Sequence, residues 1–362
     1  MSCTIRNGIR RCAVFTALLV ALANVAVAQA VEIRHLVTYK VATFEQRLKE
    51  LAAQGFRLEK LYEAPAMMTQ TAILTRQAGV TTPRAEYLLL GTKRLPTLRK
   101  ELEEAATQGY EVIGAMAAMV PYIGTDIILV LERPVGNVAP RFSYTLISTG
   151  LGKEEKFAES LPKLVSEGFH PVKVLQNLDM SIGIFVGINR SADLIVMARP
   201  LVGTTTDQPM DYQTLETRRL STLEKELKQA AGQGFSFSLS SPSRLVLLAR
   251  SQGQTAPTAE YKLLKLKKPA EAETELSAQA QQGFLYRASF MGDTGFHLVL
   301  EKAQQTKRAE AKLEYKLLKM PLKEKGQEQF QKEVEQLLAA GFAVLDIVAF
   351  DKLLLVRWPK TA

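Results

Sequence analysis

The sequence predicts an α+β fold of six tandem β-α-β-β repeats, each a three-stranded mixed sheet with one helix on one face. Two features of the sequence indicate this fold. In four units, the second residue of the predicted first strand stands 22 positions before a glycine. This residue is Ile33, Tyr87, Tyr212 or Tyr261. That glycine is followed by an aromatic residue, and the pair recurs six times, at Gly55-Phe56, Gly109-Tyr110, Gly168-Phe169, Gly234-Phe235, Gly283-Phe284 and Gly341-Phe342. The predicted units are residues 31–77, 85–134, 141–200, 211–251, 259–303 and 313–359.

A helix is expected between the first strand and the glycine of each unit. In the second unit, apolar residues stand 11, 7, 4 and 3 positions before Gly109, at Leu98, Leu102, Ala105 and Ala106. This spacing is the apolar stripe of a helix that lies on a sheet surface. The glycine falls where a helix C-terminus needs a residue with left-handed backbone geometry.

The last strand of each unit ends in a basic residue, as in the segment from Ile127 to Arg133. Both alternating sets of side chains in that segment are apolar, which predicts a strand covered on both faces. If the last strand lies between the other two, its base faces the acid that opens the first strand, as in Glu86 with Arg133 and Glu260 with Lys302. The recurring bases then form cross-strand ion pairs, and anion binding is the alternative interpretation.

One helix covers only one face of a three-stranded sheet, and a unit of this size buries too little apolar surface to be stable alone. We therefore expect the units to pair within the chain, sheet on sheet or edge to edge. Six units would give three such pairs.

The pattern Glu-Tyr-Lys-Leu-Leu at residues 260–264 and 314–318, followed by a helix, a Gly-aromatic pair and a strand ending in Arg or Lys, resembles a family of small bacterial domains. This family is known as domain of unknown function 4177, and the resemblance extends over most of the chain as diverged copies. Such domains typically carry Gly-Trp-Glu after the helix, whereas here Phe or Tyr replaces Trp and only Tyr110-Glu111 keeps the acid. The resemblance implies no established chemistry.

Residues 1–28 have the form of a secretory signal peptide, with Arg6, Arg10 and Arg11 before an apolar run and a small-x-small site ending at Ala28. We expect cleavage near Ala28 and export to the periplasm or the cell exterior, with an uncleaved membrane anchor as the alternative. Both cysteines, Cys3 and Cys12, precede this site, so the mature chain would contain no disulfide.

The charge pattern argues against nucleic-acid binding. The formal charge of +9 falls to +6 when the three arginines of the signal are removed. No further transmembrane span is expected after cleavage, and the oligomeric state does not follow from the sequence.

No catalytic or cofactor-binding motif is present, so we expect neither a cofactor nor a metal. The three histidines, His35, His170 and His297, occupy different positions of the repeat and are expected to be structural. Only a cluster of polar residues from several units in one cleft would indicate an enzyme.

Two surfaces are candidates for contact with a partner. Apolar residues near the hairpin tips of the first three units form the first, because flexible methionines suit adaptable binding surfaces; contacts between neighbouring repeats are the simpler interpretation. These residues are Met67, Met68, Met116, Met119, Tyr122, Ile184 and Phe185. Lysines around the opening strands of the fifth and sixth units form the second, which would meet anionic polymers or lipid headgroups, although lysines also protect exposed strand edges. They are Lys262, Lys265, Lys267, Lys268, Lys316 and Lys319.

The sequence thus predicts an exported, non-catalytic repeat protein that binds or scaffolds an envelope protein or polymer. A binder of a small apolar ligand or lipid between paired sheets is the alternative. An enzyme with one degenerate site is a third possibility.

Overall fold

Six units of the same build follow one another along the chain, each consisting of a strand, a helix and a hairpin, as predicted. The computed structural model describes residues 31–62, 70–92, 94–120, 124–136, 139–148, 154–179, 190–201, 210–216, 219–240, 245–257, 259–292, 295–303, 313–323, 325–349 and 351–358. The predicted signal peptide lies outside these residues.

The units have the following elements. Unit 1 comprises β1 (Val31–Thr38), α2 (Val41–Ala53), β2 (Arg57–Leu61) and β3 (Gln70–Gln77); unit 2 comprises β4 (Ala85–Thr92), α3 (Leu95–Thr107), β5 (Glu111–Val120) and β6 (Gly124–Pro134). Unit 3 comprises β7 (Phe142–Ser148), α4 (Glu154–Ser166), β8 (His170–Asp179) and β9 (Arg190–Pro200); unit 4 comprises β10 (Met210–Glu216), α6 (Leu220–Gly232), β11 (Ser236–Ser240) and β12 (Leu245–Ser251). Unit 5 comprises β13 (Ala259–Lys265), α7 (Pro269–Gln281), β14 (Leu285–Gly292) and β15 (Gly295–Ala303); unit 6 comprises β16 (Glu314–Lys319), α8 (Gln327–Ala339), β17 (Phe342–Val348) and β18 (Lys352–Arg357). Within the described residues, no helix is both long enough and apolar enough to cross a membrane.

The last strand of each unit lies in the middle of its sheet and is antiparallel to both neighbours. The predicted register is confirmed, because Glu86 is paired with Arg133 and Glu260 with Lys302. The expectation of a mixed sheet is wrong. The first and second strands are the parallel ones, and they lie at opposite edges, so every pair of adjacent strands is antiparallel.

The glycine of the Gly-aromatic pair ends the helix, as predicted. Gly55 follows α2 with a φ of 88°, and the amides of Gly55 and Phe56 donate to the carbonyls of Ala52 (2.9 Å) and Leu51 (3.1 Å). This is the bonding of a Schellman motif, which needs a left-handed residue after the C-cap. It turns the chain sharply from the helix into the second strand.

The base at the end of the last strand holds the unit together. The Arg133 guanidinium pairs with Glu86, donates from Nη1 to the Gln108 carbonyl at the end of α3 (3.0 Å), and lies 4.5 Å from the Tyr110 ring centroid. Arg76, Arg250 and Arg357 make the same three contacts in units 1, 4 and 6. The ion-pair interpretation of these arginines therefore describes their geometry, with the aromatic ring and the helix C-terminus as additional partners.

Both faces of each central strand are buried, against two different helices. In β6, Ile127, Leu129 and Leu131 pack with α3 of the same unit, whereas Ile128 and Val130 pack with α2 of the preceding unit. Each helix therefore lies between two sheets and contributes to both cores.

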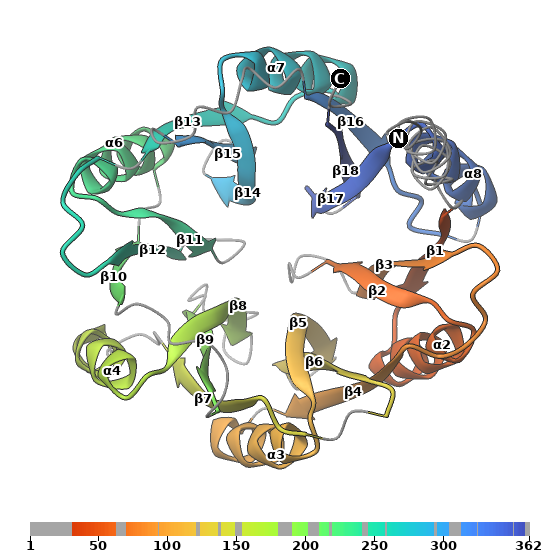
Figure 1. The fold of residues 1–362 in the computed structure, drawn as a ribbon, viewed down its shortest axis with the longest axis horizontal. Coiled ribbons are helices and arrows are strands. Elements are labelled where there is room, and N and C mark those ends of the chain that lie inside the picture. The colour runs from red at the N-terminus through yellow and green to blue at the C-terminus, as the bar shows by residue number, and fades with distance from the viewer. Residues whose placement is uncertain are drawn as a thin grey trace, which may run out of the picture.

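The units form a closed ring, with the helices outermost and the N-terminal strand β1 beside the C-terminal helix α8 (Figure 1). Each helix contacts the first strand of the next unit, and α8 closes the series on β1. A neighbouring unit covers the second face of each sheet, as expected. The three expected pairs of units are not formed, because the neighbour covers that face with its helix and not with its sheet.

We predict that Gly55→Ala destabilises the protein more than twice as much as Gly79→Ala. Both glycines have φ values above 80°, which costs about 1 kcal/mol for alanine. A Cβ at Gly55 would also lie 2.7 Å from the Val80 carbonyl oxygen in the linker to unit 2, whereas one at Gly79 has no atom within 4 Å. Urea unfolding followed by circular dichroism measures both changes, and equal losses would contradict the proposed contact with the linker.

Candidate functional site

The second strand of every unit contains a β-bulge that begins three residues after the cap glycine. A bulge leaves one residue out of the ladder and bends the strand. At four junctions the amide of the residue at which the bulge begins donates to a tyrosine from the first strand of the next unit: the Leu58 amide donates to the Tyr87 hydroxyl (2.7 Å). Val112 with Tyr144, Phe237 with Tyr261 and Tyr286 with Tyr315 repeat the arrangement. We call this contact the tyrosine latch.

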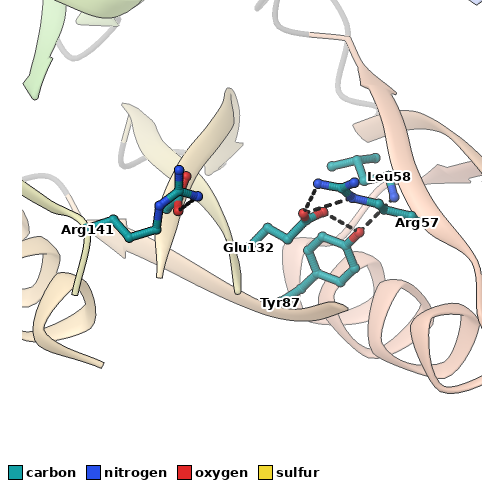
Figure 2. Close-up of polar contacts among 6 residues, drawn as sticks. Arg57, Leu58, Tyr87, Glu132 and Arg141 are labelled. Atoms are coloured by element: carbon teal, nitrogen blue, oxygen red, sulfur yellow. Dashed lines mark hydrogen bonds and ion pairs between the residues drawn. The ribbon is translucent and has the colours of Figure 1, made fainter. Parts of the chain in front are cut away.

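At the junction of units 1 and 2 the latch is extended by a buried carboxylate (Figure 2). The Tyr87 hydroxyl donates to Glu132 (2.8 Å), and Arg57 donates from Nε to the same carboxylate (2.9 Å). Glu132 is 5% exposed. Its charge is therefore compensated by two donors within a core, as a buried charge requires. Arg141 and Glu111 form a separate ion pair of 2.8 Å at the next junction.

A cluster of the same three residue types occurs in unit 5, where Tyr261 donates to Glu301 (2.7 Å) and Arg287 donates from Nε to it (2.9 Å). Here the arginine belongs to the same unit as the tyrosine and the glutamate, whereas Arg57 comes from the preceding unit. Burial and the adjacent carboxylate raise the pKa of Tyr87 and of Tyr261 well above the usual value. The hydrogen bond to Glu132 raises the pKa of Arg57. Each tyrosine thus stays protonated as a donor, which suits a structural contact better than a catalytic base.

Two junctions lack the latch. In unit 3 the bulge begins at Pro171, which has no amide hydrogen, and the Tyr212 hydroxyl lies 3.2 Å from His170 Nδ1 instead. Between units 6 and 1 the tyrosine position holds Ile33, which packs in an apolar cluster with Phe330 and Leu353. We call this junction, where the two ends of the chain meet, the seam.

His35 is a histidine buried at the seam. It is 5% exposed, its ring centroid lies 5.2 Å from that of Phe330, and neither ring nitrogen has a hydrogen-bond partner. Burial lowers the pKa of His35 to about 4. Arg34 and Glu335 are the charged neighbours on the two elements that meet there, and Glu335 also accepts from the Ile33 amide (3.3 Å).

All six units surround a cavity of about 310 Å³, which we call the axial cavity because the innermost strands β2, β5, β8, β11, β14 and β17 converge on it (Figure 1). Each unit contributes residues from the bulge of its second strand. One residue from each, in chain order, is Lys60, Ile113, Lys173, Ser238, Arg287 and Asp346.

Asp346 is the carboxylate of this cavity that lies deepest. Its Oδ1 accepts from the Ile347 amide (2.8 Å) and its Oδ2 accepts from the buried Tyr286 hydroxyl of unit 5. Burial raises the pKa of Asp346, against the lowering effect of the Tyr286 hydrogen bond and of the charges on Lys60 and Lys173. Burial and the nearby carboxylate also raise the pKa of Tyr286. The side chain keeps some exposed surface, which faces the cavity.

These residues were not among those predicted from the sequence, although a signal was present. The position five residues after the cap glycine is charged in three of the six units, where it is Lys60, Lys173 and Asp346. Aligning the six copies at this position brings together the three charged residues that line the axial cavity.

The predicted apolar surface falls mostly outside the described residues, which do not include Met67, Met68, Tyr122, Ile184 and Phe185, nor the side chain of Met119. Met116 is described, and it follows the simpler interpretation and not that of a partner surface. It is 5% exposed and packs with α2 and the sheets of units 1 and 2, so it belongs to the contact between repeats.

Three of the six lysines of the predicted basic surface have local partners. Lys262 donates to Gln279 (2.8 Å), Lys316 pairs with Glu273 (3.1 Å) and Lys267 lies 3.7 Å from Glu275. The other three, Lys265, Lys268 and Lys319, are exposed. Binding of an anionic polymer by this surface stays a prediction.

Other hollows differ from the axial cavity in their lining. A groove of about 650 Å³ lies at the outside of the seam, and its lining is basic, with Arg34, Lys40, Arg47 and Lys323 against one acid, Glu50. The space between neighbouring sheets, predicted as a lipid site, is filled by a helix such as α3. No group of three or more potential metal ligands occurs in the described part of the chain.

No protein-family model, curated protein or solved structure matches this chain. The resemblance to domain of unknown function 4177 therefore stays a hypothesis.

We predict that Tyr87→Phe lowers the free energy of unfolding by about 1 to 3 kcal/mol, because the Leu58 amide and the buried Glu132 each lose a partner. Tyr144→Phe is the matched control. Tyr144 accepts from Val112 and has no buried carboxylate to bond, so its loss should cost about 1 kcal/mol. Urea titrations of both variants compare the two latches, and an equal cost would show that Glu132 does not depend on Tyr87.

We also predict that the seam weakens on acidification. With a pKa of about 4 in the folded protein and about 6.5 in the unfolded chain, His35 binds its proton more readily when unfolded, so stability falls from pH 6.5 down to pH 4. The loss from pH 7 to pH 5 is about 2 kcal/mol. Urea unfolding should show this loss in the wild type and in the control Ile73→Val, but not in His35→Leu. The same pH dependence in all three proteins would contradict the assignment.

Proposed function

We propose that this is an exported, non-catalytic binding protein whose ligand site is the axial cavity. The observation that supports this is the meeting of charged and hydroxyl side chains from separate units around one partly open space. A volume of about 310 Å³ lies at the lower end of the range for small-molecule sites. Export rests on the form of residues 1–28, and the ligand is therefore expected among small molecules of the envelope or the surroundings.

Binding is favoured over catalysis by the kinds of groups present. Polar residues from several units meet in this cavity, which is the feature that we expected of an enzyme. Its charged groups, however, are ammonium, guanidinium and carboxylate, without histidine or cysteine among the described lining residues. Asp346 is held by two donors, and Arg287 is bonded to Glu301. Such groups orient a ligand more readily than they move protons at neutral pH.

A scaffolding role is the second candidate, favoured by the exposed Lys265, Lys268 and Lys319 of units 5 and 6. It would use the outside of the ring and not the cavity. Sedimentation with vesicles containing anionic lipid tests it, since attraction through these lysines must fall as salt is added.

We predict that Ser289→Trp, which fills the axial cavity, abolishes ligand binding. Ser221→Trp is the control, because Ser221 is exposed on α6. Small molecules released from the purified proteins by acid are identified by mass spectrometry, and any compound found is added back in a thermal-shift titration, in which a ligand raises the melting temperature. The wild type and Ser221→Trp should carry and respond to the compound. A Ser289→Trp variant that still does so would contradict a site in the cavity.

A further inference from the structure

The axial cavity presents charges of both signs from different units. Asp346 belongs to unit 6, and Lys173 belongs to unit 3, which stands across the ring from it (Figure 1). Lys60 comes from unit 1, beside unit 6. Both lysine charges act on the Asp346 carboxylate, so the three side chains share one electrostatic environment.

The Asp346 carboxylate retains acceptor capacity. A carboxylate offers about four lone-pair positions, and the Ile347 amide and the Tyr286 hydroxyl use two of them. The bonds fix its orientation, while its remaining surface faces the cavity. A donor with a positive charge is the partner that it can still accept.

The other charged groups of the lining change this picture little. Arg287, from β14, is bonded to the buried Glu301, and Glu59, from β2, is exposed beside Lys60. Ser238 and Ser289 add neutral hydroxyl groups. The sum over Glu59, Lys60, Lys173, Arg287 and Asp346 is one positive charge, with both signs represented.

We propose that the axial cavity binds a small zwitterion, a molecule with an amino group and a carboxylate a few bonds apart, such as a free amino acid. The ammonium group donates to Asp346, and the carboxylate lies toward Lys60 and Lys173. This inference rests on the proposed function, since it names the ligand class of the same site.

The charges favour this class over singly charged molecules. A simple anion would lie beside the Asp346 carboxylate, and a simple cation beside two ammonium groups, and each would leave a partly buried charge of like sign next to it. A zwitterion pairs with both. Since a liquid water occupies about 30 Å³, the cavity has room for about ten non-hydrogen atoms, which is the size of common amino acids.

The test uses isothermal titration calorimetry of the full chain with amino acids and with analogues that lack one charge. L-alanine is compared with propionate and ethylamine, and L-leucine with 4-methylpentanoate and 3-methylbutylamine. At least one of the two amino acids should bind at least tenfold more tightly than both of its analogues. An analogue that binds as tightly as its amino acid would overturn the proposal.

Two variants assign the two ends of the ligand. Asp346→Asn should weaken amino-acid binding at least tenfold and leave carboxylate binding unchanged or stronger, whereas Lys173→Met should weaken both. Circular dichroism melting shows whether each variant folds. Lys173→Met alone keeps the test decisive if Asp346→Asn does not fold, and unchanged amino-acid affinity in a folded variant overturns the assignment.

Failure of this inference is distinguishable from failure of the proposed function. If neither amino acid binds but another compound co-purifies and is lost in Ser289→Trp, the cavity is a binding site and the zwitterion class is wrong. If no compound co-purifies or binds in a manner that Ser289→Trp prevents, both proposals are wrong.

Discussion

The structure depends on one packing constraint, which is that every sheet has two apolar faces and every unit has only one helix. The central strand β6 shows the constraint most directly, because Ile128 and Val130 need a cover as much as Leu129 and Leu131 do. A helix placed between two sheets covers one face of each, so a row of units satisfies all its inner faces. Only the two ends of such a row would stay bare. Contact of α8 with β1 removes both ends at once, and the chain therefore closes on itself.

Two polar devices set the geometry of this closed ring. Within a unit, a base such as Arg133 links the first strand, the helix C-terminus and the aromatic ring after the glycine. Between units, a tyrosine such as Tyr87 accepts from the amide of the residue at which the preceding bulge begins. Bulges bend a strand and redirect its side chains. The bulges of units 1, 3 and 6 therefore also direct Lys60, Lys173 and Asp346 toward the axis, although of these three only the bulge of unit 1 makes a tyrosine latch.

Much of the fold follows from the sequence because its signals are local and repeated. The cap glycine, the strand order and the register of Glu86 with Arg133 each depend on residues within one unit. The arrangement of the units was missed because a helical stripe was taken to face one sheet, whereas the α3 residues from Leu98 to Ala106 contact two. The choice between a partner surface and a contact between repeats stayed open for Met116 for a related reason, since its neighbour is the helix of another unit. The axial cavity needs all six units at once, and no single copy of the repeat contains it.

The seam and the cavity are coupled by their positions in the ring. Lys60 stands on unit 1 and Asp346 on unit 6, which are joined to each other at the seam and not by a peptide linker. A ligand that contacts both side chains spans the junction that lacks a tyrosine latch and that buries His35 without a partner. A molecule that binds only the folded ring stabilises it by mass action. Under the proposed function, the ligand would also contact both units of the seam and would supply there a polar bridge of the kind that tyrosine supplies at four other junctions.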